Sequence, residues 1–423
     1  MNVLILGGGG REHTFCWKLA QSPLCKKIYT APGNAGTEQL SMNLPLDPMD
    51  FKAVKQAVLE YQIQMVVVGP EAPLVAGIHD YFKQDEALHE VFIIGPQKEA
   101  ATLEGSKEFA KKFMQRHNIP TAQYASFTAE TVEEGKAFLE KMNSPYVLKA
   151  DGLAAGKGVL IIESLSQAQS ELESMLVNQK FGTASQTVVI EEFLSGIELS
   201  AFILTDGNTG IDFPMAKDYK RIGEGDTGLN TGGMGAISPV PFVTPDFENK
   251  IKDRIITPTL EGLKKDNIPF QGFIFIGLIK VGEDPYVIEY NVRMGDPETE
   301  VVLPRIASDL MELLVATAEQ RLTEYNISVD SEVAATVMAV AGGYPEAYEK
   351  GNPITGLEPT EGTLLFHAGT QKKGSETVTN GGRVLSITGK GATMKEALQK
   401  AYNRLKSTHF KNINYRKDIG FDL

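Results

Sequence analysis

Cysteine is nearly absent from this 423-residue chain, which contains only Cys16 and Cys25. Two cysteines are too few to cross-link a secreted fold of this size, so we expect a reducing, cytoplasmic location. The N-terminus, MNVLILGGGGREH, lacks a basic leader, and its glycines end the apolar run too early for a signal peptide. No window approaches about 20 uninterrupted apolar residues, so we expect no membrane span.

An excess of basic residues is also lacking, because 41 Lys and Arg stand against 54 Asp and Glu and the net charge is −13. We therefore expect no broad surface for nucleic acid or for an anionic membrane. An anionic ligand must instead be held by local Lys, Arg and backbone N–H groups. Hydrophobic residues make up 42% of the chain, which is typical of globular cores, and the length favours roughly three domains.

The first 100 residues alternate between short apolar runs and segments of helical pattern. The apolar runs are VLIL, IYTA, MVVVG and VFIIG, and predicted helices follow from Arg11, after Asp50 and near Gly77. This alternation predicts parallel βαβ units in an open sheet. The loops GGGG, APGNAG, GPEAPL and GPQ follow the predicted strands. Ligands bind at the carboxyl ends of such strands, so we expect the loops to line one crevice.

The middle of the chain favours mixed α and β structure. EGSKEFAKKFMQRHNIP is typical of a helix capped by Ser106, and the predicted strands include 146–150, 159–163 and 187–194. GFIFIGLIKV and YVIEYNV predict a hairpin around GEDP. From about residue 327, the strands EVAATVMAVA and RVLSIT and a helix at 393–406 predict a smaller terminal domain.

The motif GGGGREH follows the first predicted strand and raises the possibility of a dinucleotide-binding site. The third glycine of G-x-G-x-x-G would fall on Glu12, and no acid ends the second predicted strand. A nicotinamide site is therefore excluded. What is left is a tight turn into a helix N-terminus, which either binds an anion such as phosphate or is only a structural turn.

Two further segments suggest a nucleotide site. LKADGLAAGKGV, residues 148–159, joins two predicted strands by small residues that let the backbone approach phosphates, and Lys149 would add a positive charge. It is not a P-loop, because Gly158 follows Lys157, and a simple hairpin is the alternative. VIEEFLSGIEL, residues 189–199, is either part of the same site or a solvated acidic edge.

The stretch VIEYNVRMGDPETE, residues 287–300, predicts a strand with two contrasting faces. Alternation places an apolar set on one face, Ile288, Tyr290 and Val292, and a polar set on the other, Glu289, Asn291 and Arg293. Mg²⁺ prefers carboxylate and amide oxygens together with substrate phosphates, so Glu289 and Asn291 indicate a magnesium site. Arg293 could neutralise a transferred phosphoryl group. The alternative is an exposed ion pair between Glu289 and Arg293.

The sequence lacks the motifs of zinc sites and of serine nucleophiles. No His or Cys cluster has the spacing of a zinc site, and the serine-nucleophile motif G-x-S-x-G is absent.

Taken together, these motifs resemble one family, the phosphoribosylamine–glycine ligases, or glycinamide ribonucleotide synthetases, of the ATP-grasp superfamily. The matching motifs follow the family's order nearly from end to end: GGGGREH, APGNAGT, VGPEAPLV, LEGSK, IPTA, LKADGLAAGKGV, VIEEFLSGIE, NTGGMGA, VIEYNVRMGDPE, AGGYP, FHAGT, VTNGGRVL and YRKDIG. The resemblance implies an α/β and α+β multidomain fold. It comprises a Rossmann-like domain at 1–103, a two-lobed ATP-grasp domain at 104–326 with a mobile lid lobe at about 122–190, and a small α/β C-terminal domain at 327–423.

The resemblance also implies the reaction. ATP phosphorylates the carboxylate of glycine, and the amine of 5-phosphoribosylamine attacks the glycyl phosphate, which gives glycinamide ribonucleotide, ADP and phosphate for purine biosynthesis. Mg²⁺, or alternatively Mn²⁺, is the implied metal, and the enzyme is expected to be a monomer. Two alternatives stay open: another ATP-grasp carboxylate–amine ligase, and a nucleotide-binding homologue without turnover.

Site residues follow from the matching motifs. Those implied to be catalytic are Arg293, Lys149 and Asp296, and the implied metal ligands are Glu289 and Asn291. Those implied to bind the nucleotide are Lys107, Lys149, Gly156, Lys157, Gly158, Glu191, Phe193, Leu194 and Glu198. Those implied to hold phosphoribosylamine and glycine are Gly10, Glu12, Glu71, Asn230, Thr231, Gly232, Gly233, Asp296, Pro297 and Glu298.

The chain departs from the family pattern at a few positions. PMAKDYKR is two residues shorter than the family's usual PMATSQDHKR, and Tyr219 takes the place of the histidine. The roles of the neighbouring Asp218, Lys220 and Arg221 depend on this segment. Leu229 replaces a proline and Met294 a phenylalanine, and both exchanges are expected to repack the site without abolishing it.

Overall fold

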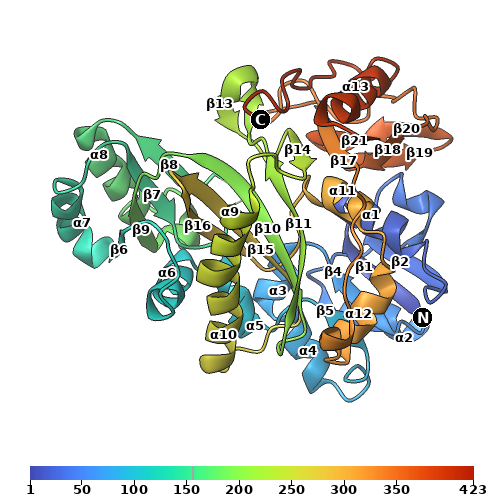
Figure 1. Cartoon of the computed structure of the whole chain (residues 1–423), viewed down its shortest axis with the longest axis horizontal. Coiled ribbons are helices and arrows are strands. Elements are labelled where there is room, and N and C mark those ends of the chain that lie inside the picture. The colour runs from blue at the N-terminus through green and yellow to red at the C-terminus, as the bar shows by residue number, and fades with distance from the viewer. Residues whose placement is uncertain (155–156) are drawn as a thin grey trace.

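The computed structural model describes residues 1–154 and 157–423 (Figure 1). The first hundred residues form a five-stranded parallel sheet with the strand order β3-β2-β1-β4-β5. The strands are β1 Asn2–Gly7, β2 Lys27–Pro32, β3 Met42–Asn43, β4 Met65–Val68 and β5 Phe92–Ile94, and the helices between them are α1 Gly10–Leu19, α2 Phe51–Glu60, α3 Glu71–Ala76 and α4 Ile78–Gln84. The predicted parallel βαβ arrangement is therefore confirmed.

The predicted helix near Gly77 is present as two helices, α3 and α4. Gly77 has φ = +93°, a left-handed conformation that ends α3 and redirects the chain into α4. Glycine adopts this conformation without the steric cost that a side chain would add.

Helices α5 Lys98–Gly105 and α6 Lys107–Arg116 lead from this sheet into a separate four-stranded antiparallel sheet. Its strand order is β6-β9-β7-β8, with β6 Tyr124–Thr128, β7 Tyr146–Ala150, β8 Val159–Ile162 and β9 Thr187–Glu192. Helices α7 Val132–Leu139 and α8 Leu165–Leu176 cover this sheet and close a hydrophobic core of its own. The unit projects from the rest of the molecule (Figure 1).

An eight-stranded sheet, with the order β16-β15-β10-β11-β14-β17-β21-β18, forms the centre of the molecule. Its strands in chain order are β10 Ile197–Thr205, β11 Gly210–Asp218, β14 Gly235–Ser238, β15 Gly272–Val281, β16 Asp284–Asn291, β17 Val333–Val340, β18 Thr363–His367 and β21 Arg383–Gly391. Strand β14 pairs with β17, so the strands of the C-terminal segment continue the central sheet. The sequence had not indicated this continuity.

Shorter elements complete the fold. Two small hairpins pair β12 Arg221–Gly223 with β13 Thr227–Asn230, and β19 Thr370–Lys373 with β20 Glu376–Thr379. The remaining α-helices are α9 Pro245–Ile251, α10 Thr257–Lys265, α11 Thr299–Val302, α12 Leu310–Ala318 and α13 Met394–Leu405. A π-helical turn joins α9 to α10. In the described residues, no helix is both long and apolar enough to cross a membrane.

One hydrophobic core joins the N-terminal sheet to the central sheet. It includes Leu4 and Val66 from the first sheet and Ile276 from β15. The packing of the two sheets brings Arg11, which follows β1, and Glu71, which follows β4, next to the loop that follows β16. A further core, between α13 and the strands β17 and β21, supports the C-terminal segment.

The predicted hairpin of β15 and β16 is present, but the predicted apolar face of β16 was wrong at one position. The pairing register shifts between Gly277 and Leu278, which produces a bulge at Ile288. Because a bulge inserts one extra residue, the alternation of faces changes there. Val287, and not Ile288, therefore lies in the core with Tyr290 and Val292.

Candidate active site

Two lysines and one glutamate form a buried cluster on the four-stranded sheet and helix α6. The Nζ atom of Lys149 on β7 lies 2.9 Å from Oε2 of Glu191 on β9, and the Nζ atom of Lys111 lies 3.2 Å from the same oxygen. Lys111 also donates to Oγ1 of Thr121 at 2.8 Å. Sequence analysis missed Lys111, although its position four residues after Lys107 places both lysines on one face of the helix.

Burial and charge oppose each other in this cluster. Burial alone would raise the pKa of Glu191, but Lys149 and Lys111 hold it below its ordinary value. Burial lowers the pKa of Lys111 to about 8, in spite of the attraction of Glu191. The second carboxylate oxygen of Glu191, Oε1, is buried and has no hydrogen-bond partner among the described residues. It is a free acceptor at a position predicted to bind the nucleotide.

The other residues predicted to bind the nucleotide surround this cluster. Lys107 is the first residue of α6, and burial lowers its pKa, with Glu289 opposing this effect. Phe193 and Leu194 follow β9, and Phe193 is exposed. Glu198 on β10 is paired with Lys220 at 2.6 Å, and this pairing lowers its pKa.

The loop after β7 is described on both sides of residues 155 and 156. Lys157 is exposed, and Gly158 accepts a hydrogen bond from the backbone N–H of Ala150. A Cβ atom on Gly158 would lie 2.8 Å from Cβ of Ala154, so glycine permits the close approach of the loop. The predicted contact of Gly156 lies outside the described residues.

Glu289 and Asn291 on β16 are the residues that could hold a metal ion. Gly277, opposite Glu289, leaves room for its side chain, since a Cβ atom there would lie 3.2 Å from Cγ of Glu289. Asn291 is buried, and its Nδ2 atom has no partner among the described residues. Within the described ranges, no group of three or more His, Cys, Asp or Glu could hold a metal. This donor set suits Mg²⁺ that is shared with substrate phosphates better than a metal held by protein alone.

Arg293 makes its ion pairs with carboxylates other than Glu289. Its Nη2 atom lies 2.6 Å from Oε1 of Glu104, and its Nε atom lies 3.4 Å from Oε2 of Glu71. Arg293 and Arg11 together hold the pKa of Glu71 below its ordinary value, against burial. Sequence analysis missed Glu104, although it lies in the quoted motif LEGSK. The alternative ion pair between Glu289 and Arg293 does not form.

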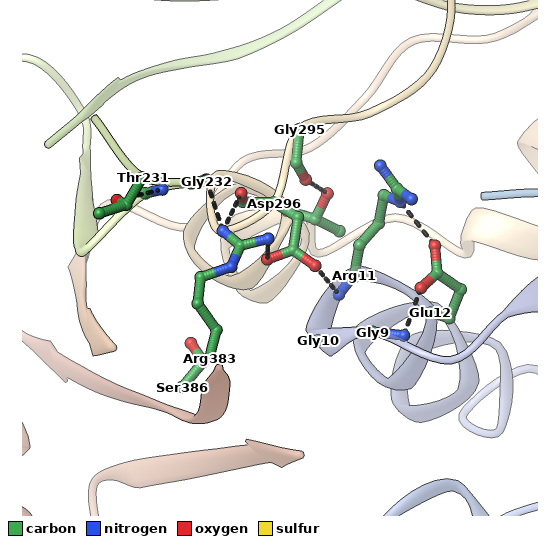
Figure 2. Close-up of polar contacts among 12 residues, drawn as sticks. Gly9, Gly10, Arg11, Glu12, Thr231, Gly232, Gly295, Asp296, Arg383 and Ser386 are labelled. Atoms are coloured by element: carbon green, nitrogen blue, oxygen red, sulfur yellow. Dashed lines mark hydrogen bonds and ion pairs between the residues drawn. The ribbon is translucent and has the colours of Figure 1, made fainter. Parts of the chain in front are cut away.

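The glycine-rich loop before α1 is closed by the protein's own carboxylates (Figure 2). The N–H of Gly9 donates to Oε2 of Glu12 at 2.6 Å, and the N–H of Arg11 donates to Oδ2 of Asp296 at 3.2 Å. The guanidinium of Arg11 contacts Oε1 of Glu12 and the carbonyl of Met294. Two of the donors that could have held a phosphate therefore already have internal acceptors.

Three of the four predicted N-terminal loops meet at this point. The amide of Asn34, in the loop after β2, donates to the carbonyls of Gly8 and Gly9. The loop after β4 lies against Glu12, because a Cβ atom on Gly69 would lie 2.0 Å from Glu12 Oε1. The loop after β5 instead bonds elsewhere, from the N–H of Gly95 to the carbonyl of Gln271.

Arg383, at the start of β21, is a further residue of this site that sequence analysis did not single out. It contacts the loop that carries the NTGGMGA motif and the loop that carries GDPE, and it lies beside Asp296 (Figure 2). Pro297 packs against Gly233, which has φ = +121°. The hydroxyl of Thr231 donates to the carbonyl of Lys220, and it accepts a hydrogen bond from the N–H of Gly233.

Two buried glutamates follow Asp296. Oε1 of Glu298 accepts a hydrogen bond from Ser200 at 3.2 Å, and burial together with Asp218 raises the pKa of Glu298 to about 7. Burial, followed by the charge of Asp296, raises the pKa of Glu300 well above its ordinary value. Both carboxyl oxygens of Glu300 are without a hydrogen-bond partner among the described residues.

Three polar residues of the shortened segment 214–221 have partners within the protein. Tyr219 is buried, and its hydroxyl donates to Oδ1 of Asp422 at 2.8 Å. Its neighbour Lys220 points to Glu198 instead. Arg221 donates to Gly228 within the β12–β13 hairpin.

The exchanged apolar residues have different environments. Met294 is buried in the core, whereas Leu229 is exposed on β13, as is the predicted substrate residue Asn230.

The structure thus places a lysine-rich, four-stranded lobe beside a central antiparallel sheet that bears a carboxylate and an amide on its edge strand. This fold and site define an ATP-grasp ligase, an enzyme that uses ATP. Models of three domains match the chain: the N domain of phosphoribosylglycinamide synthetase at residues 1–104, its ATP-grasp (A) domain at 105–299 and its C domain at 334–422. The chain belongs to the phosphoribosylamine–glycine ligase family.

Individual relatives agree with this assignment. The chain is 45% identical over 427 residues to the phosphoribosylamine–glycine ligase of Vibrio vulnificus, and the match covers 100% of this chain and 98% of the relative. It is 46% identical to a bifunctional purine biosynthetic protein of Pichia angusta, in which it spans only 53% of the length. The crystal structure of the Thermotoga maritima ligase superimposes with a TM-score of 0.86 at 37% identity and covers 99% of this chain and 100% of that one. The predicted family, fold class and carbon–nitrogen ligase activity are confirmed.

Proposed function

We propose that this chain joins glycine to 5-phosphoribosylamine through a glycyl phosphate and releases glycinamide ribonucleotide, ADP and phosphate. A carboxylate is a poor electrophile until one of its oxygens becomes a leaving group, and phosphorylation by ATP provides this without a protein nucleophile. Catalysis then rests on positioning and on charge neutralisation. The observation that carries the proposal is the link from the Lys149–Glu191 cluster to β16, the strand that bears Glu289 and Asn291: Lys111 donates to Thr121, whose hydroxyl donates to the carbonyl of Val287.

The proposal divides the chain into three parts. Residues 1–103 and 327–423 frame the site for phosphoribosylamine and glycine, and residues 104–326 hold ATP, with 122–190 acting as a lid. Lys149 and Lys107 would neutralise the phosphates, while Glu191 would accept a hydrogen bond from the adenine amine through its free Oε1. Closure of the lid would exclude water from the acyl phosphate, which otherwise hydrolyses readily.

The residues present fit a divalent metal ion. Glu289 and Asn291 would hold Mg²⁺, or alternatively Mn²⁺, and its role is to neutralise charge on the transferred phosphoryl group. The absence of a three-carboxylate cage among the described residues is consistent with a metal that the nucleotide shares. Asn291 would hold the metal through Oδ1, and its unpartnered Nδ2 is a donor that a phosphate oxygen beside the metal could accept.

On the other side of the site, we assign substrate positioning to Arg293 and Asp296. Arg293, held by Glu104 and Glu71, would stabilise the negative charge of the acyl phosphate. Asp296 is a carboxylate at neutral pH, because Arg383 and Arg11 hold its pKa below the ordinary value against burial. A charged carboxylate suits an amine substrate as a hydrogen-bond acceptor. We further propose that the enzyme is a cytoplasmic monomer.

The test measures ADP release with ATP and Mg²⁺ while glycine and phosphoribosylamine, generated in situ, are left out in turn. We expect release to depend on both substrates. Lys149→Met in a parallel preparation controls for contaminating ATPases. ADP release that depends on neither substrate, or ATP binding without turnover, would contradict the proposal and favour another acceptor or a homologue without turnover.

A further inference from the structure

Arg383 bonds to two loops that come from distant parts of the chain. Its Nη1 atom donates to the carbonyl of Gly232 at 2.5 Å and to the carbonyl of Asp296 at 2.6 Å. Its Nη2 atom lies 3.1 Å from Oδ1 of Asp296. Asp296 is at the same time the acceptor for the N–H of Arg11. Figure 2 shows Asp296 between the two arginines.

These contacts connect three loops. The guanidinium of Arg383, in the C-terminal segment, bonds directly to the loops 230–233 and 295–298, and the carboxylate of Asp296 extends the connection to residues 9–11 around the start of α1. All three loops carry residues to which the proposed function assigns the glycine and phosphoribosylamine side of the site. The nucleotide residues Lys149 and Glu191 lie on the separate four-stranded sheet.

We infer that Arg383 is a positioning residue, which holds Asp296 and the 230–233 loop in the geometry that glycine and phosphoribosylamine require. The inference deepens the proposed function and rests on it. It gives the C-terminal segment a part in substrate recognition that is separate from its contribution to the fold.

The shape of the site favours arginine over lysine at this position. A guanidinium presents several donors in a fixed plane, and here two of its nitrogens contact three oxygens of two residues. Gly232 leaves the room that this plane needs, because a Cβ atom there would lie 2.9 Å from Cζ of Arg383. A lysine offers a single nitrogen, which cannot reproduce both contacts to Asp296 and the contact to Gly232.

Loss of the guanidinium would affect the carboxylates as well as the loops. Asp296 lies near Glu298 and Glu300, and Arg383 is the first charge that favours its ionised form. Without Arg383, three acidic groups would share this region with one cation fewer, and the loop that carries them would lose its position.

The test compares Arg383→Met and Arg383→Lys with the native enzyme. We expect kcat/KM for glycine and for phosphoribosylamine to fall about 10- to 100-fold in Arg383→Met, which corresponds to one or two strong contacts. The Kd for ADP, measured by calorimetry, should stay within about twofold. Arg383→Lys should recover part of the loss at most. Added methylguanidinium should partly restore an Arg383→Ala variant, because the arginine side chain is 21% exposed and a small cation can enter.

Arg404→Met is the matched control. Arg404 is a buried arginine of the C-terminal segment that bonds to Thr360 and to none of the three loops. Its loss should lower stability and leave both substrate KM values unchanged. Equal substrate KM and kcat values in folded Arg383→Met and native enzyme would overturn the inference. If Arg383→Met does not fold, Gly232→Ala displaces the same guanidinium, and unchanged substrate kinetics in that variant would overturn the inference equally.

The result also separates the inference from the proposed function. A native enzyme whose ADP release ignores glycine contradicts the proposed function itself. A native enzyme that depends on both substrates, together with an unaffected Arg383→Met variant, contradicts only the role of Arg383.

Discussion

Two clusters of ionisable side chains, one rich in lysine and one rich in acidic residues, lie on different parts of the proposed site. The nucleotide cluster, which comprises Lys107, Lys111, Lys149 and Glu191, has three cations for one carboxylate. The acidic cluster, which comprises Asp296, Glu298 and Glu300, has three acidic groups, of which Asp296 is held by Arg383 and Arg11. Buried charges of one sign are costly unless a partner compensates them. The comparison favours the proposal that each cluster is completed by its ligand: anionic phosphates at the first, and amine groups at the second.

Removing Glu289, the proposed metal ligand, should have the largest effect. We expect Glu289→Ala to lower turnover by about 10²- to 10³-fold, comparable to the loss of one preorganised electrostatic group, while the fold persists. The measurement is ADP release as a function of Mg²⁺ concentration. Glu283→Ala, in the exposed turn of the same hairpin, is the control and should be normal. Near-normal turnover of Glu289→Ala would remove this residue from the site.

A milder change would weaken the nucleotide cluster alone. Lys111→Met removes one of the two cations on Glu191, so Glu191 and the phosphates lose positive charge. We expect KM for ATP to rise about 10-fold, or about 1.4 kcal/mol, with little change in KM for glycine. Lys112→Met, whose lysine pairs with Glu108 on the exposed face of α6, serves as the control. An equal rise in both KM values would show that the clusters are not separate.

Replacing Glu300 with its neutral isostere, glutamine, tests the acidic cluster. Because the folded-state pKa of Glu300 is raised, its contribution to stability is fully present below its unfolded pKa and is lost as pH rises through the folded pKa. Glu300→Gln removes this loss, so the variant should be more stable than the native enzyme at pH 8, by about 1–3 kcal/mol.

Urea denaturation at a series of pH values from 5 to 9 measures this difference. The gain should grow with pH, and Glu312→Gln, at an exposed position on α12, should show no such trend. A gain that does not depend on pH would mean that Glu300 is ionised in the folded enzyme.

The smallest effect is expected outside both clusters. Tyr219→Phe removes one hydrogen bond to Asp422 and should destabilise the enzyme by about 0.5–1.5 kcal/mol. Because Lys220 is held separately by Glu198, KM for each substrate should stay within about twofold. Thermal unfolding and steady-state kinetics provide the two measurements. A large kinetic effect would instead make the shortened segment part of the substrate site.

Much of the architecture could be predicted from local patterns. The parallel N-terminal strands, the Ser106 cap of α6 and the β15–β16 hairpin all depend on residues close in sequence, and each is present. The domain boundaries and the individual roles of the site residues stay predictions. The bulge that moves Ile288 out of the core could not be foreseen, because alternation in one strand says nothing of its register with Gly277 on another.

The sequence by itself determined which chemical groups the enzyme possesses and the family to which it belongs, because residue types and their spacing are local properties. Only the tertiary structure decided which groups become partners. Arg293 pairs with Glu104, Lys111 shares Glu191 with Lys149, and Arg383 and Arg11 meet at Asp296. These partners are separated by tens to hundreds of residues, and Arg11 and Asp296 by 285. Their contact depends on how three sheets pack together, which no local pattern in the chain encodes.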